Sequence, residues 1–205
     1  SYQQIIADLT DAMGLLEYES NRFAISKGAV EALLARVYLY KGDNDNAIMY
    51  ASKVIDNGTY KLNKKYNDIY DIEGSSEAIF ELQFLGTDGS SFTGILSVSP
   101  PEVSANYDDF FEPMDYDDDP RSYRYYDDGK VVYCDKYGTN KNQIDGNSIV
   151  IKLSEMYLIR AEALAKKNPN DLTSALEDLN MVRERSLPSM PYTIADVPNL
   201  DSFIT

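Results

Sequence analysis

The stretch that decides the fold is residues 26–58, SKGAVEALLARVYLYKGDNDNAIMYASKVIDNG. Its first half repeats apolar residues at i, i+3, i+4, i+7 and i+8, the spacing of one helix face: Val30, Leu33, Leu34, Val37 and Tyr38. Ser26 stands where a helix N-cap is expected, and Gly42 stands where the helix would stop. This half therefore predicts one amphipathic helix.

The second half predicts another helix, which packs antiparallel to the first. The polar turn 43–46 can cap its start, and Asn57-Gly58 can end it. Its apolar stripe is Ala47, Ala51, Val54 and Ile55. A connection this short forces two consecutive helices to lie side by side in opposite directions.

The same design returns near the end of the chain. One helix face is predicted after a Ser154 cap, with Leu153, Met156, Tyr157, Ala161 and Leu164. Residues 168–171, NPND, interrupt the pattern and can cap the next helix. The stripe of that helix is Leu172, Ala175, Leu176, Leu179 and Val182.

Two such hairpins follow the tetratricopeptide pattern in outline. The large, small and aromatic consensus positions are occupied by Leu34, Ala35, Tyr38, Ala47 and Val54. Residues 1–16 fit the second helix of a preceding pair. Because such units need neighbours to cover their apolar faces, we expect the chain to be an internal portion of a longer protein.

A long irregular insertion separates the hairpins. Residues 78–85 alternate apolar and polar side chains, which predicts a short half-buried strand, and residues 130–134 predict a second. The remainder is rich in Gly, Ser, Asp, Asn and Tyr. We expect one domain divided into helices at 1–62, a ligand-face insertion at 63–151, and a second hairpin with a tail at 152–205.

Composition excludes several classes of function. The 205 residues carry a net charge of −15, which disfavours nucleic acid and anionic membranes. Histidine is absent, which excludes catalysis by histidine and metal sites ligated by histidine. The single cysteine, Cys134, therefore has no histidine base to activate it as a nucleophile. The charged residues on the apolar helices, Arg36, Glu155, Arg160 and Glu162, are expected to pair between packed helices.

The order of several strings resembles the SusD/RagB family of nutrient-binding lipoproteins. These strings are KGA at 27–29, ALLARVYLY at 32–40, GTYKL at 58–62, SEAIFELQ at 76–83, DDPR at 118–121 and LSEMYLIRAEA at 153–163. The resemblance covers nearly the whole chain. It implies a mainly α fold, an α-α superhelix of tetratricopeptide-like hairpins with the Tyr- and Asp-rich insertion as the ligand face.

The resemblance also implies a function. Members capture oligosaccharide or polysaccharide at the extracellular face of the outer membrane, pass it to a SusC-like TonB-dependent transporter, and catalyse nothing. Membrane attachment is expected only through a lipid anchor that these residues lack. The alternative is a tetratricopeptide scaffold that binds a peptide or protein partner.

The insertion carries the residues that we expect to contact a glycan. Sugar recognition combines flat aromatic faces with hydroxyl-binding polar groups, and the stretch from residue 92 to residue 137 holds both. The candidate ligand-binding residues are Phe92, Asn106, Tyr107, Asp109, Tyr116, Arg121 and Tyr125. Packing of these aromatics against the helices is the competing interpretation.

Three interpretations are open for residues 117–121, DDDPR. It could bind Ca²⁺, although its spacing does not match an EF-hand loop. It could supply the carboxylate pair of a glycosidase. We favour a structural turn fixed by Pro120, with Arg121 paired to a neighbouring Asp, and we expect no cofactor.

Overall fold

The computed structural model describes residues 1–84, 147–187 and 190–204, together with the backbone of 125–127 and 132–134. Within these ranges the protein is mainly α, as predicted, with seven helices and two sheets of two strands each. The helical hairpins are present, whereas the tetratricopeptide consensus itself stays a prediction.

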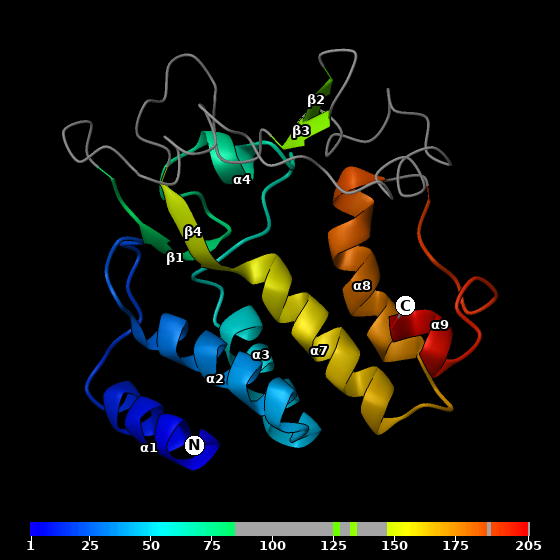
Figure 1. Cartoon of the computed structure of the whole chain (residues 1–205), viewed down its shortest axis with the longest axis horizontal. Coiled ribbons are helices and arrows are strands. Elements are labelled where there is room, and N and C mark those ends of the chain that lie inside the picture. The colour runs from blue at the N-terminus through cyan, green and yellow to red at the C-terminus, as the bar shows by residue number, and fades with distance from the viewer. Residues whose placement is uncertain (85–124, 128–131, 135–146, 188–189, 205) are drawn as a thin grey trace.

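Five helices lie side by side and pack each against the next along the chain (Figure 1). They are α1 (Tyr2–Met13), α2 (Lys27–Lys41), α3 (Asn44–Asp56), α7 (Leu153–Lys167) and α8 (Thr173–Ser186). The short helices α4 (Asp68–Asp71) and α9 (Leu200–Ile204) lie outside this row. The row brings the two hairpins, far apart in sequence, into contact through α3 and α7.

The α2/α3 hairpin has the caps that its sequence predicts. The Ser26 side chain accepts the backbone N–H of Ala29, and the Asp43 side chain accepts that of Asn46. Gly42 ends α2 in the left-handed conformation at φ 80°, which a residue with a Cβ adopts only with strain.

Small and branched side chains fill the core where α2, α3 and α7 meet. Leu34, Ala35, Ala47, Val54 and Met156 are each 0% exposed and belong to one cluster. Alanine at these positions lets the helix axes approach closely. Truncating a fully buried residue such as Leu34 to alanine would cost about 2–5 kcal/mol, because the surrounding helices relax only partly.

The strand β1 (Ala78–Leu82) forms where it was predicted and pairs antiparallel with β4 (Ser148–Lys152), which was not predicted. Its burial does not follow the sequence alternation, because register shifts flank Phe80. Glu81 is 3% exposed and Leu82 is 46% exposed. The buried Glu81 carboxylate accepts the backbone N–H of Gly74 at 3.1 Å.

The second predicted strand is confirmed in part. β3 (Val132–Cys134) occupies the end of the predicted segment 130–134 and pairs antiparallel with β2 (Tyr125–Asp127). The proposed division at residues 62 and 151 stays a prediction. β4 crosses the second of these boundaries and runs directly into α7.

The predicted Ser154 cap is wrong. Helix α7 begins at Leu153 with Lys152 at the N-cap position and no side-chain cap. Ser154 lies inside the first turn and is 2% exposed. The Leu153 N–H instead donates to the Glu77 carbonyl at 2.9 Å, because β4 enters the helix beside the residue that precedes β1.

Charges on the apolar helices pair, and two of the three pairs join helices. Arg36 donates to both Glu155 carboxylate oxygens at 2.6 and 2.8 Å, which connects α2 with α7. Arg160 reaches Asp178 on α8 in the same two-pronged way. The prediction is wrong for Glu162, which pairs with Lys166 one turn along its own helix.

Candidate ligand-binding site

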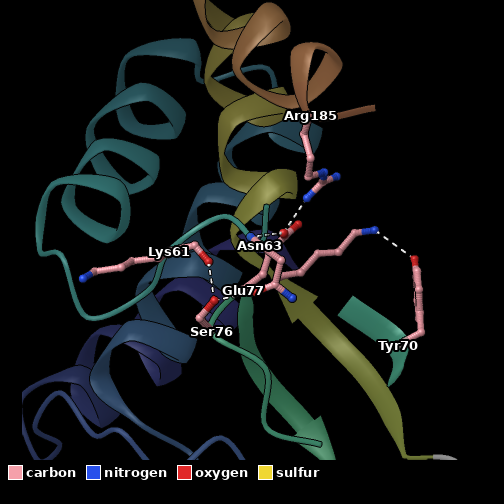
Figure 2. Close-up of polar contacts among 7 residues, drawn as sticks. Lys61, Asn63, Tyr70, Ser76, Glu77 and Arg185 are labelled. Carbon is pink, nitrogen blue, oxygen red and sulfur yellow. Dashed lines mark hydrogen bonds and ion pairs between the residues drawn. The ribbon is translucent and has the colours of Figure 1, made fainter. Parts of the chain in front are cut away.

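A buried ion pair joins the last turn of α8 to the residue before β1. Arg185 donates to the Glu77 carboxylate, and the two side chains are 7% and 0% exposed (Figure 2). The same carboxylate oxygen accepts the backbone N–H of Asn63 at 3.0 Å. The Ser76 hydroxyl extends the network by donating to the Lys61 carbonyl at 3.1 Å.

Polar atoms in and beside this network are incompletely paired. Among the described residues, buried atoms without a hydrogen-bond partner include the following five: Asn63 Nδ2, Ser75 Oγ, Glu77 Oε1, Ser154 Oγ and Arg185 Nε. Most buried polar groups in proteins are satisfied by protein or by ordered water. Unsatisfied atoms on both members of the ion pair and on Asn63, whose backbone N–H donates to Glu77, therefore mark a place where water or a ligand group completes the bonding.

A cavity of about 370 Å³ opens beside the ion pair. This volume lies within the roughly 300–1,000 Å³ typical of small-molecule sites. Helices α7 and α8 form two of its walls, and the segments around Tyr66 and Tyr192 add aromatic rings. Its lining consists of Tyr66, Lys152, Ser154, Leu158, Leu179, Val182, Arg183, Arg185, Ser186, Leu187 and Tyr192.

The α7–α8 wall is held by a second ion pair. Arg160 Nε and Nη2 each donate to an Asp178 oxygen at 2.7 Å, and Asp178 is 5% exposed. This hydrogen bonding raises the pKa of the Arg160 guanidinium above its ordinary value, against the opposing effect of burial. The Arg160 guanidinium therefore stays charged, and its two hydrogen bonds to Asp178 tie α7 to α8.

The cavity combines ring faces with hydrogen-bond donors. The Arg183 guanidinium carbon lies 3.8 Å from the centre of the Tyr192 ring, and Arg183 Nε donates to the Met190 carbonyl at 2.6 Å. Lys152 Nζ donates to the Tyr70 hydroxyl at 3.3 Å (Figure 2). Such a surface can stack the apolar face of a ring and donate hydrogen bonds to oxygens at its edge.

None of the residues that the sequence singled out for ligand contact is among the described residues that line the cavity. Six of them lie outside the described residues: Phe92, Asn106, Tyr107, Asp109, Tyr116 and Arg121. Tyr125 lies on β2, where its backbone pairs with Cys134. The string 117–121 is also outside the described residues. Their roles stay predictions.

Sequence reasoning did not find the cavity. Leu179 and Val182 were assigned to the helix core, but they are half-buried and line the cavity. The basic residues at the end of α8 were the available signal, because Arg183 and Arg185 follow a predicted apolar stripe. Their partners lie up to 108 residues away in sequence, which no local pattern reveals.

Most of the chain falls in a region that a known protein family shares. The model of the SusD family matches residues 39–187. The chain belongs to the SusD family. The matched region begins in the last turn of α2 and ends just after α8. It includes α3, the α7/α8 hairpin and every described residue of the cavity lining except Tyr192. Among curated proteins there is no match to the chain.

Solved structures of the SusD superfamily share the fold. A protein from Bacteroides vulgatus ATCC 8482 is 31% identical with a TM-score of 0.84, over 98% of this chain and 49% of its own. One from Bacteroides thetaiotaomicron VPI-5482 is 25% identical with a TM-score of 0.82, over 99% and 50%. The SusD-family chain spans about half the length of these relatives.

A third relative has a sugar-related description. This protein from Bacteroides vulgatus ATCC 8482, described as a candidate sugar-binding protein, is 28% identical with a TM-score of 0.78 over 96% of this chain and 48% of its own. In the part of the chain that the structure describes, no helix has the length and apolar character needed to cross a membrane. Within the same residues, no group of three or more Cys, Asp or Glu side chains is arranged to hold a metal ion.

Proposed function

We propose that this chain binds oligosaccharide or polysaccharide without cleaving it. The binding would occur at the extracellular face of the bacterial outer membrane, in a lipid-anchored protein that delivers the glycan to a SusC-like TonB-dependent transporter. The observation that carries the proposal is a cavity lined by tyrosine rings and hydrogen-bond donors in a SusD-family chain. The relative described as a candidate sugar-binding protein supports the same ligand class.

The cavity favours binding over catalysis. Glycoside hydrolysis commonly needs two carboxyl groups flanking the scissile bond, about 5–10 Å apart. Among the described residues that line the cavity, none is Asp or Glu. The nearest carboxylate of the network, Glu77, is 0% exposed and bonded to Arg185, so it is not available to protonate a glycosidic oxygen.

The aromatic insertion is proposed as a second part of the ligand face. Replacing Tyr107 or Tyr116 with alanine is expected to weaken saccharide binding while leaving the melting temperature nearly unchanged. Those side chains would then stack on sugar rather than support the fold. A large fall in melting temperature with no saccharide binding would instead assign both tyrosines to the core.

Calorimetric titration distinguishes a glycan ligand from a peptide partner. Purified chain would be titrated with soluble oligosaccharides and, in parallel, with a peptide mixture of matched concentration. We expect heat from at least one oligosaccharide and none from the peptides. Heat from peptides alone would favour the helical scaffold as a peptide-binding surface and would contradict the proposed ligand class.

A further inference from the structure

The α7–α8 cavity is electropositive in an acidic protein. Its lining holds three cationic side chains, from Lys152, Arg183 and Arg185, and its described residues include no carboxylate. The whole chain has 34 acidic and 19 basic residues. Glu77 neutralises Arg185, so that pair alone does not make the cavity attract anions.

Arg183 is a cation of the lining without a direct ion pair among the described residues, although its charge reaches the exposed Asp196 carboxylate. Within the described part of the chain it makes no ion pair, and its hydrogen bond from Nε goes to the neutral Met190 carbonyl. Its guanidinium lies against the Tyr192 ring, 3.8 Å from the ring centre, which holds the planar group at the cavity wall. A guanidinium held in this way is suited to two-pronged contact with a carboxylate.

The start of α7 adds a second feature that attracts anions. The 15-residue helix has no side-chain cap. The Leu153 N–H donates to the neutral Glu77 carbonyl, so no charged side chain caps the positive end of the helix dipole. Ser154, in its first turn, lines the cavity, is 2% exposed, and has a hydroxyl oxygen with no hydrogen-bond partner among the described residues. A ligand group or its bound water would satisfy this hydroxyl.

The arrangement has a purely structural component. Arg183 and Arg185 stand in the last turn of α8, where cations offset the negative end of the helix dipole. That role explains a basic residue at the helix end. It does not explain why Arg183 lines a cavity whose other wall is the start of α7, where no side chain caps the helix.

We propose that the α7–α8 cavity accepts the carboxylate of an acidic saccharide, a uronic acid unit. The Arg183 guanidinium would pair with the carboxylate, and the tyrosine and leucine side chains would contact the pyranose ring. The size of the cavity suits one or two sugar units rather than a folded partner. This inference rests on the proposed function, since it names the class of glycan.

Titration of the protein with trigalacturonic acid and with neutral galactotriose tests the inference. We expect the acidic trisaccharide to bind roughly ten- to a hundredfold more tightly, the range of one charge-assisted contact. Arg183→Gln should remove most of this preference. Lys64→Gln, which removes the same charge at an exposed residue outside the lining, should change the affinity less than about twofold.

The titrations distinguish failure of the uronic acid inference from failure of the proposed glycan binding. Equal binding of both trisaccharides by the unmodified protein would overturn the inference and leave glycan binding standing. An acidic preference unchanged by Arg183→Gln would also overturn it. Binding of tetraglutamate but of neither trisaccharide would assign the cavity to acidic peptides and contradict both. Because the first comparison uses the unmodified protein, it holds even where Arg183→Gln fails to fold.

Discussion

Removing Arg185 is expected to destabilise the protein strongly. The substitution Arg185→Met keeps much of the side-chain length but leaves the Glu77 carboxylate at 0% exposure, with one backbone N–H from Asn63 at 3.0 Å. Leaving a buried charge uncompensated costs about 3–5 kcal/mol. In a chain of this size each kcal/mol lowers the melting temperature by about 2–4 °C, so a fall of roughly 6–20 °C is expected.

A matched pair on the same scaffold provides the control. Arg36 and Glu155 also form an Arg–Glu pair, here with two hydrogen bonds, but their side chains are 29% and 27% exposed. Arg36→Met should therefore cost only about 0–1 kcal/mol, because water solvates the partner that remains. Urea denaturation gives both free energies of unfolding.

The combination of Arg185→Met with Glu77→Gln separates charge from packing. The double variant removes the stranded carboxylate, so it should be more stable than Arg185→Met alone. A loss below about 1 kcal/mol for Arg185→Met, or losses that simply add in the double variant, would refute the assignment of a coupled buried pair.

Close packing at Gly28 and the buried Glu81 carboxyl give two further predictions. Gly28→Ala should destabilise the fold by about 1–3 kcal/mol, because the added Cβ would lie 2.8 Å from Tyr60 Cε2; Gly14→Ala, whose Cβ meets nothing nearer than 3.4 Å, is the control, and equal thermal shifts would contradict this. Burial raises the pKa of the Glu81 carboxyl in the folded protein. The stability that this group contributes is therefore present at pH values below its unfolded pKa of about 4.3, and it is lost as the pH rises through its folded pKa. Glu81→Gln should therefore gain stability relative to the native protein between pH 4 and pH 7 in urea denaturation, and a constant difference would contradict the raised pKa.

The parts of the fold that were predictable depend on local physics. The α2/α3 hairpin follows from an apolar period of 3.6 residues, an oxygen-bearing cap at Ser26 and a glycine at the left-handed position 42. Each of these signals acts over a few residues. The sequence therefore carries them in full, and the family resemblance agrees with them.

The features that escaped prediction are set by contacts between distant segments. Ser154 resembles a cap, but β4 continues into the helix and the Glu77 carbonyl takes the first N–H instead. Glu81 is buried and Leu82 exposed because irregular pairing with β4 overrides the alternation. The cavity needs Tyr66, Lys152 and Arg183 to meet, and no sequence spacing records such a meeting.

The central claim is that the chain binds glycan and does not cleave it. Affinity gel electrophoresis against a panel of neutral and acidic polysaccharides, with analysis of the products after prolonged incubation, tests both halves at once. The account predicts retarded migration in at least one polysaccharide, with no new reducing ends. Release of oligosaccharides, or unretarded migration in every gel, would contradict it.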